Sequence, residues 1–397
     1  MSVRRATVRA VNELTARWAG AEGGGTVFSA AGLWPLLAFL ADGADGPARA
    51  ELADALGVPA DEAGGFAREL LETLGVMRGL DAALGVWTTR SLELREAWRA
   101  GLPAGAHGVL TGDPEADQGA LDAWAAQATR GLVKRMPVAL TDDTDLVLAT
   151  ALALRTRWLQ PFSERPVEFE GGPWDGRGLL SLWRQTVLLD RVGVADTPHG
   201  FVTELKVLGD NALDVHLLLG EPDMTPDQVL GAGVGVLAGR HHVTPGPRLP
   251  FGSVGPGLAV VRERSETPDP PTLDVMTVAF DLAAEHELLQ RSRLFGLTTA
   301  SDTTRGHFPG ISRTRPLAVE SARQAAMARF GSHGFEAAAV TVIGAAGAGI
   351  PQLRWLTTRV RLRFDRPFGF LAVQRHTRLA LAAGWVTDPT PYRDEEP

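Results

Sequence analysis

The feature that most constrains this chain is a long uncharged stretch near its C-terminus. Residues 337–353 carry no charged side chain, and residues 334–349 consist mostly of Gly, Ala and Val. A solvated linker is normally polar, and a buried helix holds few glycines because each one destabilises it. The stretch is instead typical of a segment that is exposed in one state of a protein and forms a β-strand in another. It therefore predicts a function that depends on a conformational change.

The composition predicts a globular protein without nucleic-acid or membrane partners. The 397 residues are 45% hydrophobic, enough to bury a sizeable core in one large domain or two closely packed ones. A net charge of −8 argues against nucleic acid or an anionic membrane as a partner. A membrane-spanning helix would require a run of about eighteen apolar residues, and the sequence contains no such run. The first twenty residues lack the apolar core of a signal peptide, which predicts a cytoplasmic location unless a leader has been removed.

Hydrophobic periodicity predicts helices in the first 135 residues and strands after residue 141. The expected helices cover residues 1–20, 33–43, 47–56 and 120–133. The expected strands cover residues 146–158, buried on both faces, then 186–194, 201–208, 212–219, 359–364, 368–373 and 379–386. Turn residues at 209–211 join two of these strands into a hairpin. Helices followed by antiparallel strands predict an α+β fold rather than a βαβ repeat.

No motif in the chain argues for an enzyme, a cofactor or a metal. Residues 231–235 resemble a dinucleotide loop, but Val236 stands at the third glycine of that motif. A capping box at residues 225–228 predicts that these glycines lie in a helix instead. The acidic turn at 142–145 lacks the Gly and Glu that a calcium loop needs. Cysteine is absent, which excludes disulfides and thiolate zinc sites.

Five segments, in order and at compatible spacing, resemble signature segments of the serpin family of serine protease inhibitors, of bacterial type. They are residues 27–29 with 43–46, 121–131, 146–162, 334–339, and 364–370 with Thr377, Gly384 and Pro389. Residues 334–339 read Gly-Phe-Glu-Ala-Ala-Ala, where the family often has G-T-E-A-A-A. Residues 364–370 read Phe-Asp-Arg-Pro-Phe-Gly-Phe, similar to the family's F-x-x-P-F-x-F. The resemblance extends over nearly the whole chain.

The resemblance implies a serpin fold, with a helical N-terminal half packed on a large central β-sheet and smaller sheets around it. It implies a single domain over residues 1–390, a reactive-centre loop over 332–358 within it, and a tail over 391–397. Serpins present this loop as bait, are bound covalently by the serine protease that cuts it, and insert the freed loop into the central sheet. The expected partner is therefore a serine protease, and the expected protein is a monomer without a cofactor or metal.

The family pattern also assigns a hinge and a cleaved bond within the loop. The hinge residues are Gly334, Phe335, Glu336, Ala337, Ala338 and Ala339, and the family spacing places the cleaved bond at Ala348–Gly349. A small residue at the cut suits an elastase-like or subtilisin-like protease rather than a trypsin-like one. Side chains alternate along a strand, so an inserted loop turns Phe335 inward and Glu336, its one charge, toward solvent.

Two departures from the family pattern bear on function. Phe335 replaces the usual small residue, and overpacking there is expected to cost about 1–3 kcal/mol and to favour a plain substrate over an inhibitor. The chain beyond the cut is long, which leaves Arg354 and Arg359 as trypsin-type alternatives for the cleaved position. The alternative function is that of a non-inhibitory serpin, acting as a binding or scaffold protein or as a simple protease substrate.

The resemblance further implies two polar groups around the central sheet. The family's polar cluster beneath the sheet aligns with Ser29, Asp122, Thr150 and Gln324. Thr150 and Gln324 are expected to hydrogen-bond to one another in place of an Asn–His pair. The family's Lys–Glu pair at the top of the sheet aligns with Ala279 and Ser332, so both charges are absent together and neither is left unpaired.

Overall fold

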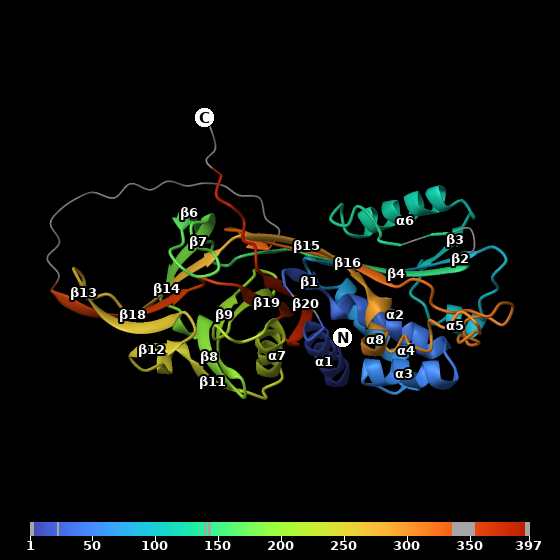
Figure 1. The fold of residues 1–397 in the computed structure, drawn as a ribbon, viewed down its shortest axis with the longest axis horizontal. Coiled ribbons are helices and arrows are strands. Elements are labelled where there is room, and N and C mark those ends of the chain that lie inside the picture. Colours follow the sequence, from blue (N-terminus) through green and yellow to red (C-terminus); the bar gives the residue numbers. More distant parts are fainter. Residues whose placement is uncertain (1–3, 22–23, 139, 142–143, 336–353, 394–397) are drawn as a thin grey trace.

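The structure, a computed structural model, describes residues 4–21, 24–138, 140–141, 144–335 and 354–393. It has an α+β fold in which most helices gather at one end and the strands extend toward the other (Figure 1). The helices are α1 (Arg5–Ala19), α2 (Ala30–Gly43), α3 (Gly46–Leu56), α4 (Ala60–Gly75), α5 (Glu96–Arg99), α6 (Pro114–Ala128), α7 (Pro226–Leu237) and α8 (Ser292–Phe295).

The strands of the described residues form four hydrogen-bonded sheets. The largest is antiparallel and has the order β1 (Thr26–Phe28), β20 (Leu379–Val386), β19 (Phe368–Gln374), β10 (Leu213–Leu219), β9 (Gly200–Val207), β8 (Val192–Thr197) and β11 (His242–Pro245). A six-stranded sheet has the order β12 (Gly252–Gly255), β13 (Leu258–Ser265), β18 (Trp355–Arg363), β14 (Thr272–Val278), β7 (Gly178–Thr186) and β6 (Ser163–Glu168). The two smaller sheets have the orders β15 (Phe280–Glu287), β16 (Arg323–Phe330), β17 (Gly334–Phe335), β5 (Thr156–Arg157), and β3 (His107–Leu110), β2 (Leu80–Thr89), β4 (Leu146–Leu154).

Local sequence signals account for several element boundaries. Helix α3 ends at Gly57, whose φ of +69° is a left-handed conformation that glycine adopts without strain. Helix α7 begins after Thr225, whose backbone N–H donates to the side chain of Gln228 as a capping box requires. Gly233 lies in this helix where it packs on β10, and a Cβ there would come within 2.3 Å of Leu218. The glycines of residues 231–235 are thus helical, as predicted, and do not form a dinucleotide loop.

The strand expected over residues 186–194 is wrong. Strand β7 ends at Thr186, a 3₁₀ turn follows, and β8 begins at Val192 in a different sheet. The prediction failed because Val187 and Leu188, which resemble core residues, are exposed at this crossing between sheets. The apolar pattern therefore spans a turn rather than a strand.

The helix expected over residues 120–133 is α6, which starts at Pro114 and ends at Ala128. It ends early because Arg130 and Gly131 have positive φ angles of 53° and 85°, which a right-handed helix does not allow. The side chain of Asp113 accepts hydrogen bonds from the first turn and begins the helix. Its second half is the part that the sequence located correctly.

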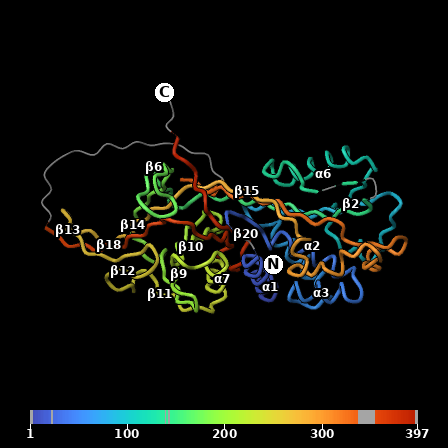
Figure 2. The backbone as a smooth tube through the Cα atoms, in the orientation of Figure 1, coloured from blue at the N-terminus to red at the C-terminus, as the bar shows by residue number. Residues whose placement is uncertain are grey.

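The three-stranded sheet lies between two helical layers, as the ribbon and the backbone trace both show (Figure 1, Figure 2). Helices α2 and α4 cover one face, and α6 covers the other. On the α6 face, Trp87 and Trp124 make an edge-to-face contact with ring centroids 4.9 Å apart, and Val147 is buried beside them. On the α2 face, Leu146 and Leu148 of β4 are only half-buried. The prediction that this strand is buried on both faces is therefore only partly right, because a cavity adjoins its α2 face.

Candidate functional site

Strands β4 and β16 lie on the two sides of a cavity without pairing to one another. Within the described residues, β4 pairs with β2, while β16 pairs with β15 and, at its end, with β17. The cavity between them has a volume of about 150 Å³. Residues 144–150 line one side of it and residues 316–324 line the other. We call this cavity the slot.

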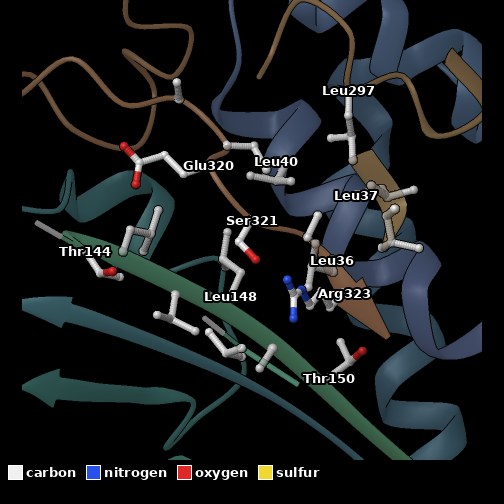
Figure 3. Close-up of a pocket in the computed structure, with 18 of the residues that line it drawn as sticks. Leu36, Leu37, Leu40, Thr144, Leu148, Thr150, Leu297, Glu320, Ser321 and Arg323 are labelled. Atoms are coloured by element: carbon white, nitrogen blue, oxygen red, sulfur yellow. The ribbon is translucent and has the colours of Figure 1, made fainter. Parts of the chain in front are cut away.

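The slot is lined mainly by apolar side chains. Leu36, Leu37 and Leu40 of α2 contribute to its lining, with Leu148 and Thr150 of β4 on the side of the strand (Figure 3). A strand edge that has no partner leaves backbone N–H and C=O groups available for pairing. The slot therefore combines an apolar lining with strand edges at its margins: β4 on one side, and the first two residues of β16, Arg323 and Gln324, on the other.

The two-residue strand β17 pairs with strands on both of its sides. Phe335 lies opposite Phe330 of β16 on one side and opposite Thr156 of β5 on the other. Gly334 lies opposite Arg157, so both β17 residues are antiparallel to β5. Strand pairing thus extends into the stretch predicted as the reactive-centre loop, and β18 likewise includes residues 355–358. The first two predicted hinge residues are already part of a sheet.

The Phe335 side chain is buried within a group of aromatic rings. It is 3% exposed, and its ring centroid lies 6.1 Å from that of Phe370. Phe280 stacks on Phe330 at 5.3 Å and contacts Phe370 at 5.1 Å, while Trp158 contacts Phe330 at 5.0 Å. Phe335 faces the core, as predicted from strand alternation. The ring lies among these aromatic side chains in the intact protein, and the cost expected from overpacking stays a prediction.

Polar contacts surround this aromatic group at the end of the sheet. The hydroxyl of Ser332 donates to Glu164 at 2.5 Å, and the N–H of Trp158 donates to the carbonyl of His333 at 2.9 Å. Arg184 lies 4.2 Å from the ring centroid of Phe162, and burial lowers the pKa of its guanidinium to about 10. Ser332 therefore has a carboxylate partner, although the Lys–Glu pair of the family pattern is absent.

The predicted polar cluster is present in part, and it centres on Ser29 and Gln324. The Gln324 side chain accepts from the Ser29 N–H at 2.8 Å and donates to the Ser29 carbonyl at 2.9 Å. The Ser29 hydroxyl donates to the Leu381 carbonyl at 2.6 Å and accepts from the Gly32 N–H at 3.0 Å. These bonds connect β16, the start of α2 and β20 directly beside the slot.

Thr150 and Asp122 do not join this cluster. The expected hydrogen bond between Thr150 and Gln324 is not formed among the described residues, because Gln324 is bonded to the Ser29 backbone. Thr150 instead lines the slot together with Gln324. Asp122 lies on α6, on the opposite face of the sheet, and accepts from the Met136 N–H at 2.8 Å.

A buried histidine that the sequence analysis did not single out lies beside the cluster. The Nε2 of His286 donates to the Val27 carbonyl at 2.9 Å, and the ring contacts Trp18 at 5.3 Å. His286 lies directly opposite Gln324 in the β15–β16 pair. The sequence could have indicated its burial, because His286 lies six residues after Phe280 and side chains an even number of residues apart share one face of a strand.

The sequence comparisons decide the family of this chain. The sequence pattern of the family described as "Serpin (serine protease inhibitor)" matches residues 3–170 and 269–389. The chain belongs to the serpin family. The expected α+β serpin fold is thus confirmed, and the family is one of protease inhibitors rather than enzymes.

Serpins from distant organisms align with most of this chain. Putative serpin-Z6C of rice (Oryza sativa subsp. japonica) is 26% identical and covers 97% of this chain and 96% of its own length. A serine proteinase inhibitor of the guinea pig (Cavia porcellus) is 23% identical over 77% of this chain and 67% of its own. These relatives come from a plant and an animal, so they support the family and give no support to a bacterial type.

Solved serpin structures share the fold. The thermophilic serpin tengpin in its native state superposes with a TM-score of 0.75 at 13% identity, covering 98% of this chain and 95% of its own. Thyroxine-binding globulin in complex with thyroxine superposes with a TM-score of 0.70 at 17% identity, covering 97% and 99%. At these identities the likeness concerns the fold alone.

Several residues assigned by the family pattern lie outside the described residues. They are the cleaved bond Ala348–Gly349 and the hinge residues Glu336, Ala337, Ala338 and Ala339. Of the trypsin-type alternatives, Arg359 lies inside β18 and is only 18% exposed at its side chain, so a protease cannot reach it there. Gly334 and Phe335 are thus the two predicted hinge residues that lie within the described part of the chain.

Membrane-spanning helices and metal-binding clusters are both absent from the described part of this serpin. No helix in that part is both long and apolar enough to cross a membrane. No group of three or more His, Asp or Glu side chains in it is arranged to hold a metal ion.

Replacing Gln324 by Met is expected to lower the free energy of unfolding by about 2 kcal/mol. The substitution keeps the length of the side chain but leaves the buried Ser29 N–H without its partner, a loss of about 1–3 kcal/mol. Chemical denaturation of the intact protein measures the change. Gln185→Met removes an exposed hydrogen bond to Asp274 and should change stability by less than about 0.5 kcal/mol. Equal changes in the free energy of unfolding would show that the buried Gln324 hydrogen bonds contribute no more to stability than the exposed Gln185 bond.

Proposed function

We propose that this serpin inhibits a serine protease by a single-use mechanism. The protease cuts the bait near Ala348–Gly349, becomes acylated, and is trapped when the freed segment enters the slot. One observation carries the proposal: the predicted hinge begins as strand β17, which already pairs with β16 and β5 in the four-stranded sheet, and β16 is also one margin of the slot. Insertion would thus extend a strand that has already begun.

The register of β17 leads an inserted segment into the slot. Strands β17 and β5 run antiparallel, so each step forward along β17 is matched by one step back along β5. If this register continues along β4 and β16, Thr341 lies between Thr150 and Gln324. The Thr341 hydroxyl would then meet the two polar side chains that line the slot. This gives Thr150 a polar role in the inserted state rather than in the intact one.

The chemistry of the segment supports insertion. Residues 337–348 are small or apolar apart from one threonine, so an inserted strand buries no charge. From Phe335 to Ala348 a strand of fourteen residues spans roughly 46 Å, on the order of the diameter of a small domain. That displacement would carry an attached protease away from the end of the sheet where it first bound.

The proposed target is a protease with a small specificity pocket, elastase-like or subtilisin-like. The proposal rests on Ala348 and on the family spacing from Gly334. A trypsin-like pocket prefers a cation at this position. A monomeric state and a cytoplasmic location remain predictions from the sequence.

Incubating the protein with elastase-like, subtilisin-like and trypsin-like proteases and running denaturing gels tests the proposal. We expect a band at the summed mass of protein and protease with one of the first two. Ala348→Arg should move this band to the trypsin-like protease, because the substitution supplies the cation its pocket binds. Clean cleavage without a summed band for every protease would contradict inhibition and favour the alternative, a non-inhibitory serpin or simple substrate.

A further inference from the structure

Strand β18 occupies an interior position in its sheet. It begins at Trp355, close behind the stretch 336–353, and lies between β13 and β14. Eight residues of β18, from Trp355 to Leu362, each face a partner on β13. A parallel pairing with β14 runs from Arg359 to Arg363 on the other side. Pulling β18 out would therefore break backbone pairing on both of its sides.

The two neighbours of β18 belong to one continuous piece of chain. Strand β13 ends at Ser265, a Pro-rich connection follows, and β14 begins at Thr272. The connection therefore passes around β18. The Thr357 hydroxyl of β18 donates to the Asp269 carbonyl of this connection at 3.1 Å. Strand β12 pairs with the other edge of β13, so β13 is itself held in the sheet.

Arg359 links β18 electrostatically to both neighbours. Its guanidinium lies 4.0 Å from the Glu263 carboxylate on β13, 3.9 Å from Asp269 in the connection and 3.8 Å from Asp274 on β14. It also donates to the Thr272 hydroxyl at 2.6 Å. Several carboxylates around one partly buried arginine form a network, which stabilises more than an isolated surface pair.

The short length of chain between Ala348 and β18 limits how far the loop of an uncleaved protein can insert. An uncleaved segment inserted as far as Ala348 would place that residue roughly 46 Å from Phe335. Only seven residue steps separate Ala348 from Trp355, and a fully extended chain of seven residues reaches at most about 25 Å. In the structure β18 lies at the opposite end of the molecule from strands β2, β3 and β4 of the three-stranded sheet (Figure 1). Full insertion of an intact chain thus requires β18 to leave its sheet, whereas a cleaved chain has no such requirement.

We propose that β12 and β13 form a clamp that keeps β18 in place, so that the intact protein does not insert its own loop. The clamp lies in residues 171–268, the part of the chain that the family pattern does not match. This inference rests on the proposed function, since it concerns when insertion occurs. It assigns the β12–β13 hairpin the role of preserving the active form until a protease cuts the bait.

The test follows intact protein, without protease, at a temperature about 10 °C below its Tm. Conversion to an inserted form appears as a second, higher-melting transition in a chain that is still uncut on a gel. Arg359→Met, which removes the ionic network, should convert at least tenfold faster than the natural protein. Arg240→Met is the matched control, because it removes an ion pair to Glu13 of α1, and neither residue belongs to the slot or to the six-stranded sheet. It should convert at the natural rate.

A removable crosslink tests the same clamp by comparing two forms of one variant, both of which lack the Arg361–Glu263 ion pair. Ala259 and Arg361 are direct partners in β13 and β18, and the chain has no natural cysteine. Ala259→Cys with Arg361→Cys in the Arg359→Met background should convert fast when reduced and not at all when oxidised.

Two results would overturn the clamp, and a third separates it from the proposed function. The clamp is wrong if Arg359→Met converts at the natural rate, or if the oxidised and reduced forms of the crosslinked variant convert equally. Either result counts against the clamp only when the cleaved protein shows the higher-melting transition, which proves that the loop can insert. If cleavage itself produces no such transition, the loop does not insert, and the proposed function fails together with the clamp.

Discussion

Cleavage near Ala348–Gly349 is expected to raise the Tm of the protein by roughly 10–25 °C. The freed segment would pair with β4 and β16 on both sides, and each net backbone hydrogen bond contributes about 1 kcal/mol. About a dozen inserted residues therefore add on the order of 10–20 kcal/mol, before counting the apolar surface buried in the slot. On the proposed mechanism, the intact protein would hold this stabilisation in reserve because its loop is tethered to β18. Differential scanning calorimetry of intact and cleaved protein measures the shift.

The control for this experiment is a cut elsewhere in the chain, after which the loop is still attached to β18 and cannot insert fully. Cleavage at the exposed bend of residues 171–172, between β6 and β7, should lower the Tm or leave it unchanged. The expectation fails if the protein cut at Ala348–Gly349 melts at the temperature of the intact protein. In that event the slot does not accept the segment, whatever the gel with proteases shows.

Phe335→Arg is expected to abolish trapping while leaving cleavage intact. The natural ring is 3% exposed among Phe280, Phe330 and Phe370, and no carboxylate is described in contact with it there. Burying an unpaired guanidinium at that position costs several kcal/mol, so β17 should leave the sheet and insertion should begin slowly or not at all. We expect the fraction of protease found in the summed band to fall at least tenfold, with cleaved protein accumulating instead.

Met327→Arg provides the matched control for this substitution. Met327 lies on the neighbouring strand β16, but its side chain is 37% exposed, so a cation there stays in water. It should trap protease like the natural protein. Trapping by Phe335→Arg at the natural level would show that Phe335 in the sheet is not the start of insertion.

Elements that depend on neighbouring residues in the sequence could be predicted well. The helix ending at Gly57, the capping box of α7 and the hairpin of β9 and β10 follow from capping and turn chemistry within a few residues. The exposed run at 187–188 misled the strand prediction, because hydrophobicity alone does not show whether a residue faces a core or a crossing between sheets.

The candidate site could be predicted only in part. The reason for success or failure differs from one residue to the next. Ser29 and Gln324 were expected close together, and they are bonded. Asp122 was expected with them, but the sheet lies between α6 and α2, and alignment with a family motif does not show which face a helix covers. Overpacking at Phe335 stays a prediction, and the three other aromatic residues around its ring come from distant strands that the local sequence does not bring together.

The family, the α+β class and the uncharged segment were readable from residue order, because each is carried by local pattern or spacing. The edges of β4 and β16 that have no partner among the described residues, the position of Phe335 in the sheet and the place of β18 between β13 and β14 were not. Each of them joins residues separated by dozens to more than a hundred positions, as when β13 pairs with β18. Such pairings are chosen by the packing of whole layers, which sets which strand edges meet and which remain open.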